Sequence, residues 1–257
     1  MGAVDSSIRG IHGAMEAMYS RFEKTSQQTL EMTTGMAHLM ERMYRANIKI
    51  ASTFKPAGNG NIHMSLMISN KTNLPITAMT GILEFENKEV DIVYSSAHQQ
   101  QDKALPNLFK SPCNLAPQEC YKQDIEIHIN EIKQCNGAIT LSIKHPLAPR
   151  ETIALKHTFG LYLIDQLRKE ILDNKLDLEL VDRLYYPVAF LRDIFEIQAI
   201  KGINSGMCVA LSSPKYKIVC EIISVSDDAN SVEVEFTSNH PALAKQLIKE
   251  LSILCTV

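Results

Sequence analysis

The sequence predicts an α+β protein in three parts: a long coiled-coil helix over residues 1–55, an antiparallel β-sandwich over residues 56–146 and an α/β domain over residues 147–257. Three observations support this prediction. Apolar residues recur at alternating spacings of three and four in the first part, they alternate with polar residues in the second, and both patterns occur in the third. With 257 residues, the chain can form one large domain or two small ones beyond the helix.

The N-terminal helix is predicted by two columns of a seven-residue repeat between Ser7 and Asn47. One column holds Ile8, Met15, Phe22, Thr29, Met36 and Met43, and the other holds Ile11, Met18, Thr25, Met32, Leu39 and Ala46. Such columns form the seam of a helix that packs along another helix. At about 1.5 Å per residue the helix is roughly 60 Å long, too long for a compact domain to cover. We therefore expect a protein partner along the seam; the alternative is an amphipathic helix lying on its own domain.

The predicted partner interface consists of the large apolar residues of this seam. They are Ile8, Ile11, Met15, Met18, Phe22, Met32, Met36, Leu39 and Met43. Thr25 and Thr29 weaken the middle of the seam, and Gly35 costs about 1 kcal/mol relative to alanine in a helix interior. The five methionines favour an adaptable surface that can repack against a partner.

The residues that flank the seam indicate which kind of partner to expect. One flank holds His12, Tyr19, Ser26, Thr33 and Met40, and the other holds Ala14, Arg21, Gln28, Gly35 and Arg42. Charged flanks normally select the partner of a coiled coil, and these two flanks are not complementary to each other. The sequence therefore favours a different chain with acidic flanks over a homodimer.

The second part reads as a series of short strands. Alternating residues predict strands at 62–68, 78–86, 89–94, 125–129 and 139–143, with a turn at 55–60 and a long polar loop at 95–118. Asn136 and Gly137 are the strongest hairpin signal in the chain and predict that the last two strands pair with each other. Several short strands without a helical pattern indicate an antiparallel β-sandwich.

The third part mixes strands and helices. The predicted order is a strand at 151–157, helices at 161–172 and 177–186, a helical turn after Pro187, strands at 206–211, 216–224 and 231–236, and a final helix from Pro241. Leu243, Leu247, Leu251 and Leu254 form the buried stripe of that final helix. This order predicts a small sheet with one face covered by helices.

The composition excludes several classes of protein. A net charge of -3 and a pI near 6.2 argue against a general nucleic-acid binder, and we identify no direct nucleic-acid site. There is no apolar run of about eighteen residues and hence no expected membrane span, and the N-terminus lacks the pattern of a secretory signal. Six scattered cysteines indicate reduced thiols in an intracellular protein. Gly2 fits the loose myristoylation pattern, but one acyl chain without a polybasic patch anchors only marginally.

A search for catalytic or metal-binding patterns finds none that holds together. Cys113 and Cys120 have no second pair, and no two histidines share a helix-face spacing. Ser205 lies one position away from where a nucleophile elbow needs its serine. His157 precedes Asp165, but a strand end and an exposed helix face do not bring them together. We expect no enzyme activity, no metal and no cofactor.

The order of the three parts resembles a known group of scaffold proteins. Residues 67–75 (MISNKTNLP) and 115–119 (LAPQE) resemble an adaptor-appendage domain of the gamma-adaptin-ear type. Residues 231–238 (SVEVEFTS), followed by Pro241 and a leucine-rich helix, resemble the end of a platform domain. Coiled coil, appendage-like sandwich and α/β platform together are similar to the region behind the β-propeller in the propeller-bearing scaffold of the Fanconi anaemia core complex and in the associated protein with which it pairs. The propeller-bearing subunits of the BBSome are a second resemblance.

The resemblance implies a scaffold without catalytic residues. A chain that stops at the platform helix is closer to the Fanconi group, because several BBSome subunits continue into a further helical hairpin; the lack of a propeller departs from both groups. The Fanconi resemblance implies dimerisation and positioning of a ubiquitin ligase subunit in the repair of DNA interstrand crosslinks, which favours the nucleus over the cytoplasm. The BBSome resemblance implies a coat-adaptor-like appendage that recruits partners in membrane or ciliary traffic.

Overall fold

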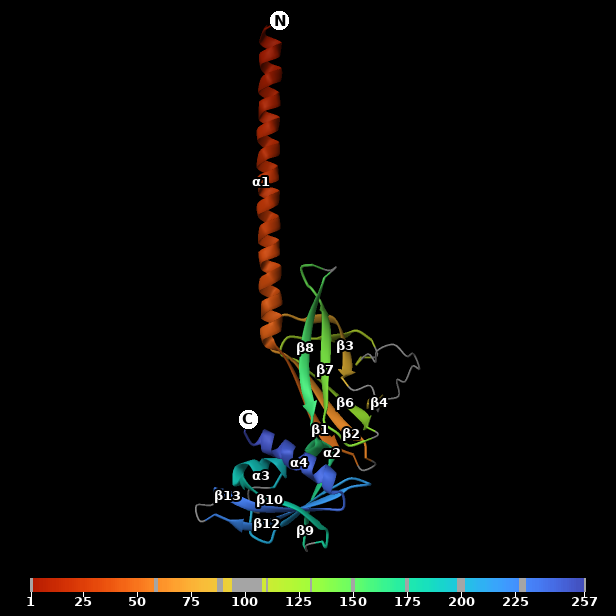
Figure 1. Cartoon of the computed structure of the whole chain (residues 1–257). Helices are drawn as coiled ribbons and strands as arrows, with labels where there is room; N and C mark the ends of the chain where they lie inside the picture. The colour runs from red at the N-terminus through yellow and green to blue at the C-terminus, as the bar shows by residue number, and fades with distance from the viewer. Residues whose placement is uncertain are drawn as a thin grey trace.

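A computed structural model shows an α+β protein with one long N-terminal helix and mostly antiparallel sheets (Figure 1). It describes residues 2–57, 60–86, 90–93, 108–109, 111–129, 131–148, 151–173, 176–197, 202–226 and 230–256, and the side chains of 2–12 and 90–93 lie outside this description. The fold class predicted from the sequence is confirmed at this level. Figure 1 shows the long helix projecting from one end of the β-rich body, with the C-terminal α/β region at the other end.

Helix α1 runs from Gly2 to Asn47 and passes directly into strand β1 (Ile48–Pro56). The Asn47 amide donates to the Met43 carbonyl, and the Asn47 carbonyl accepts from the Lys71 N–H, so two carbonyls of the last turn are satisfied where the helix ends. The helix therefore stops eight residues before the predicted boundary at residue 55. The reason is tertiary: β1 pairs along its whole length with β2 (Ile62–Asn70).

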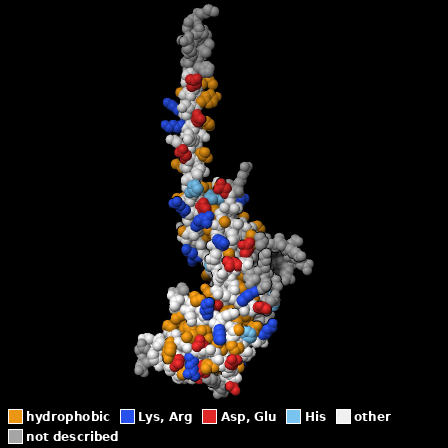
Figure 2. All heavy atoms as spheres, viewed as in Figure 1, with side chains coloured by type: hydrophobic (Ala, Val, Ile, Leu, Met, Phe, Trp, Pro, Cys, Tyr) orange, Lys and Arg blue, Asp and Glu red, His pale blue; other side chains and the backbone are white. Residues whose placement is uncertain are grey.

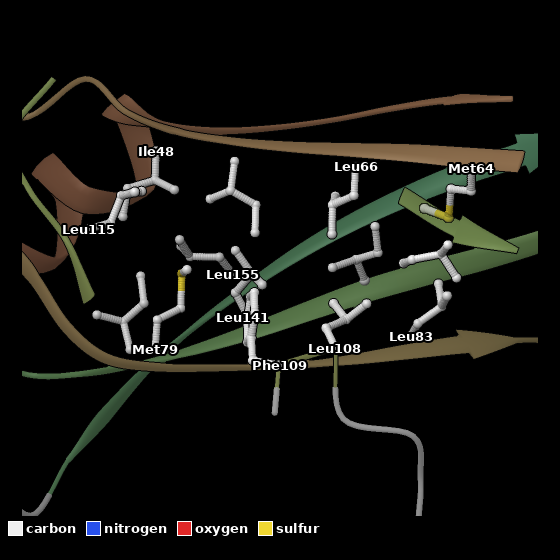
Figure 3. Close-up of a cluster of buried hydrophobic side chains, with 14 of the residues drawn as sticks. Ile48, Met64, Leu66, Met79, Leu83, Leu108, Phe109, Leu115, Leu141 and Leu155 are labelled. Atoms are coloured by element: carbon white, nitrogen blue, oxygen red, sulfur yellow. The ribbon is translucent and has the colours of Figure 1, made fainter. Parts of the chain in front are cut away.

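Two four-stranded sheets follow, in the orders β1-β2-β6-β4 and β5-β3-β7-β8. Their remaining strands are β3 (Ile76–Phe85), β4 (Val90–Val93), β5 (Cys113–Leu115), β6 (Cys120–Ile129), β7 (Cys135–Lys144) and β8 (Thr152–Leu161). Alternate residues of both sheets are buried in one hydrophobic cluster. Figure 3 shows Met64 and Leu66 from one sheet facing Leu83 and Leu141 from the other.

The predicted hairpin at Asn136 and Gly137 is wrong. Both residues lie inside β7, and the two strands that they were expected to join belong to different sheets. The glycine is needed for packing, because a Cβ atom at Gly137 would lie 2.4 Å from the ring of Phe159 on the neighbouring strand. A glycine in a strand can thus mark a close approach of a side chain instead of a turn.

The long loop predicted at 95–118 lies partly outside the described residues. Within it, Cys113 to Leu115 form the short strand β5. Leu108 and Phe109 are buried in the cluster between the two sheets, where Figure 3 shows them beside Leu141. This segment therefore contributes apolar side chains to the core, which its polar composition did not indicate.

The boundary predicted at residues 146–147 lies too early. Strand β8 pairs with β7 along its whole length and buries Ile153, Leu155 and Leu161 in the first cluster. The second cluster begins at Leu163. A division by hydrophobic cores therefore falls near Tyr162.

The C-terminal region contains a five-stranded antiparallel sheet in the order β10-β13-β12-β11-β9. Its strands are β9 (Arg168–Leu172), β10 (Glu179–Pro187), β11 (Cys208–Ser212), β12 (Lys217–Val225) and β13 (Ser231–Ser238). Helices α2 (Leu163–Gln166), α3 (Val188–Ile194) and α4 (Pro241–Leu254) contribute to the second core. The last three predicted strands and the final helix are confirmed.

Two predicted helices of this region are wrong. Within residues 161–172 only α2 is helical, and the chain then forms β9, which pairs with β11. Most of residues 177–186 belongs to β10, which pairs with β13 along its length. Leucines at helical spacing misled the prediction, because pairing at the two edges of a sheet overrode local preference.

Candidate functional site

The seam of α1 is exposed along most of its length. Among the seam residues whose side chains are described, Met15, Met18, Phe22, Met32, Met36 and Leu39 are exposed, from 46% for Met15 to 74% for Phe22. Figure 2 shows hydrophobic side chains exposed at several levels of the projecting helix. The predicted interface residues Ile8 and Ile11 lie outside the described side chains, and Met43 is half-buried. The alternative of a helix lying on its own domain does not hold for residues 15–39.

The end of α1 is fixed firmly to the body. The Tyr44 side chain is fully buried, and its hydroxyl donates to the Pro75 carbonyl at 3.1 Å. Arg45 donates from Nη1 to the Ala154 carbonyl at 2.9 Å. The imidazole Nε2 of His145 lies 3.2 Å from the Ala37 carbonyl. These contacts hold one end of the helix in a defined direction, so the rest of the seam is presented away from the body.

The threonines in the middle of the helix satisfy their own hydroxyl groups. Thr25, Thr29, Thr33 and Thr34 each donate to the backbone carbonyl four residues earlier, at 2.8–2.9 Å. These hydroxyls therefore need no partner from another chain, and the methyl groups remain available for apolar contact. Thr25 and Thr29 therefore weaken the apolar seam less than two polar residues would be expected to.

Charged side chains on the helix remain asymmetric about the seam. Arg21 and Arg42, which flank the seam, are exposed, and no described carboxylate lies within ion-pair distance of either. Arg45 pairs with Glu41 at 2.8 Å, one turn apart and away from the seam. Two unpaired cations beside an apolar stripe fit a partner helix that carries acidic flanks.

The residues considered for chemistry do not come together. His157 Nε2 lies 3.2 Å from the Ser52 hydroxyl, and burial lowers the pKa of this histidine. Asp165 instead accepts from the Tyr162 N–H at the start of α2. The described parts of the chain contain no cluster of three His, Cys, Asp or Glu side chains that could hold a metal ion. All six cysteines are free thiols, and burial raises the pKa of Cys220.

One buried carboxylate escaped the sequence analysis. Glu250 of α4 accepts from the N–H groups of Leu163 and Ile164 at 2.9 and 3.1 Å, so it caps the first turn of α2. Burial raises the pKa of Glu250 even though these two donors act in the opposite direction. Its role is to join α4 to α2. The position of Glu250 beside the apolar stripe of a leucine-rich helix is the sequence feature that could have indicated a buried carboxylate.

No family model matches this chain. No curated protein matches it either. Among solved structures, a DUF4466 family protein from Parabacteroides merdae is similar at a TM-score of 0.26 and 8% sequence identity, over 75% of this chain and 98% of that one. A similarity at this level carries no argument about fold or function. Among the helices described, none is both long and apolar enough to cross a membrane.

Proposed function

We propose that this chain is a non-enzymatic scaffold subunit that binds another protein through the seam of α1. The observation that carries the proposal is the exposure of six large apolar side chains on one helix held away from the body. Exposed apolar surface of this extent is unusual on a monomeric protein and is typical of interaction sites. The heptad spacing makes another α-helix the natural partner.

Burial of the seam supplies a large part of the energy that association needs, and the apolar surface of the partner must supply the rest. Fully burying a large apolar side chain contributes about 1.5–3 kcal/mol, and roughly two-thirds of that remains available for residues as exposed as these. Six residues then contribute about 6–12 kcal/mol before the cost of association, and the partner adds its own share. A micromolar complex needs about 8 kcal/mol. The absence of complementary flanks in this chain supports a heteromeric complex.

The resemblance described above supports a more specific version of the proposal. The two four-stranded sheets would form the appendage-like sandwich of gamma-adaptin-ear type, and the C-terminal region would form the platform domain. The complex would be of the Fanconi core type, with a nuclear role in the repair of DNA interstrand crosslinks. The BBSome-like alternative replaces this with a coat subunit of membrane or ciliary traffic.

Purification from the native cell tests this function. The chain carries an affinity tag at its C-terminus, remote from α1, and is isolated with the proteins bound to it. A wash at about 1 M salt removes proteins held only by surface electrostatic contacts. The proteins that remain bound are then identified. We expect a stoichiometric partner with a heptad helix and acidic flanks. Recovery of the chain alone, as a monomer, would contradict the proposal. A partner from the Fanconi complex or from a membrane coat would decide between the two specific versions.

A further inference from the structure

A second candidate interaction site lies where the two four-stranded sheets leave their edges open. Strand β1 is an edge strand of one sheet and β8 is an edge strand of the other, and the two strands contact each other. The Ser52 hydroxyl and the imidazole of His157 bridge them at 3.2 Å. Beyond this bridge, toward the end of α1, the two edges line a shallow groove of about 310 Å³ that is open to solvent.

The groove combines apolar lining residues, two of which are also buried in the core between the sheets, with a cationic rim. Its lining consists of the apolar Ile48, Ile50 and Leu155 and the polar Arg45, Lys49, Lys156 and His157. Glu41 is paired with Arg45, and the groove lining contains no carboxylate of its own. Burial lowers the pKa of His157, which keeps the imidazole neutral at pH 7. The charge that the groove presents is therefore positive.

Two of the three cations are available to a ligand. The guanidinium of Arg45 already donates to Glu41 and to the Ala154 carbonyl. Lys49 and Lys156 are exposed and form no ion pair with any described residue. The C-terminus of α1 opposes an anion with about half a negative charge. Two full positive charges outweigh that half charge, and bonds from Lys71 and Asn47 already satisfy two of the last carbonyls.

The edge of β8 also offers backbone hydrogen-bonding groups. The Ala154 carbonyl accepts from Arg45 and so points away from β7. Backbone groups alternate in direction along a strand, so the N–H and C=O of Lys156, two residues further on, point toward the groove as well. Among the described residues, no hydrogen bond from outside the sheet occupies them. An edge of this kind accepts an additional strand.

We infer that the groove between β1 and β8 binds an extended acidic peptide of another protein, which pairs with an open sheet edge and places its carboxylates beside Lys49 and Lys156. The half-buried Ile50 would contact an apolar side chain of that strand, since Ile48 and Leu155 already pack in the core between the sheets. A single-stranded nucleic acid also carries negative charge, but it needs aromatic rings for stacking, and His157 is the one ring in the lining. This site is separate from the seam and does not depend on it.

Fluorescence anisotropy with labelled peptides tests the inference on the full chain. The probes are capped six-residue peptides that alternate glutamate or aspartate with valine, isoleucine or leucine; glutamine or asparagine versions serve as uncharged controls. We expect the acidic peptides to bind, and the double variant Lys49→Gln, Lys156→Gln to weaken binding about tenfold or more. The matched control Lys122→Gln, Lys215→Gln removes two exposed cations elsewhere and should leave binding unchanged.

Hydrogen exchange on the complex locates the bound strand. We expect the Lys156 amide and its neighbours on β8, or the facing amides of β1, to exchange more slowly with peptide. The seam variant Met18→Asp, Leu39→Asp should bind the peptide normally, so failure of one site is distinguishable from failure of the other. The inference is overturned if no acidic peptide binds, if the lysine variant binds as well as the control variant, or if an oligothymidylate of equal charge binds more tightly than every peptide.

Discussion

The seam of α1 makes a quantitative prediction about two residues. Met18 and Leu39 lie in one column of the heptad, on opposite sides of Thr25 and Thr29, and are 65% and 69% exposed in the single chain. Burying them against a partner would contribute about 1–2 kcal/mol each. Replacing both with aspartate forfeits this energy and also places two unpaired charges in an apolar interface, at a cost of several kcal/mol. The total is about 5 kcal/mol or more, which corresponds to at least a roughly 1,000-fold loss of affinity.

The assay measures association and folding separately. Association with the purified partner is followed by light scattering or co-purification, and folding is followed by thermal unfolding of the single chain. Substitutions at exposed sites usually change stability by less than about 0.5 kcal/mol, so the melting of the body should be nearly unchanged. Glu23→Lys and Glu31→Lys are the matched controls, since both residues lie on α1 outside the two seam columns.

Two results would refute this reasoning. Unchanged assembly of the Met18→Asp, Leu39→Asp variant would show that the seam is not the partner site. A large loss in the stability of the single chain would show that the helix packs on its own body in solution, contrary to its exposure in the structure.

Two further predictions concern the body of the protein. A chain of residues 42–257 should melt cooperatively like the full chain. Residues 61–257 should be less stable by about 5 kcal/mol or more, because this shorter chain lacks strand β1 with the buried Ile48 and also lacks Tyr44. Equal melting of the two shortened chains would contradict this prediction. Burial raises the pKa of Glu250, so its contribution to stability is complete below pH about 4.3 and is lost as the pH rises through the folded-state pKa. We expect the free energy of unfolding, measured by chemical denaturation from pH about 4 to 8, to decline less in the Glu250→Gln variant than in the unmodified protein. An identical pH dependence in the two proteins would show that Glu250 does not cause the decline.

The sequence determined the elements whose pattern is local and long. The heptad columns of α1 persist over the helix because each turn repeats the same spacing, and the structure contains that helix. Strands at 62–68 and 139–143 alternate because one face of each is buried, and both were predicted. The final helix was predicted at its first residue, because Pro241 fits only the first turn. The structure adds that the His240 side chain caps this turn by accepting from the Leu243 N–H.

Pairing between distant segments decided the remainder. Residues 48–56 continue a helical stretch in sequence, yet they become a strand because β2 offers a full-length partner. Leu161, Ile164, Leu167 and Ile171 have helical spacing, but the segment after Leu167 forms β9 because it pairs with β11 at the edge of the sheet. Gly137 has the chemistry of a turn, and only the position of Phe159 explains its place inside a strand.

The two candidate sites divide in the same way. The seam follows from the sequence because its residues belong to one helix, whose period places them on one face. The groove brings together Lys49 and Lys156, which are 107 positions apart in the chain, and neither carries a local signal. Only the order of strands in the two sheets puts β1 and β8 at adjacent edges, and strand order is set by long-range packing that no short stretch of sequence encodes.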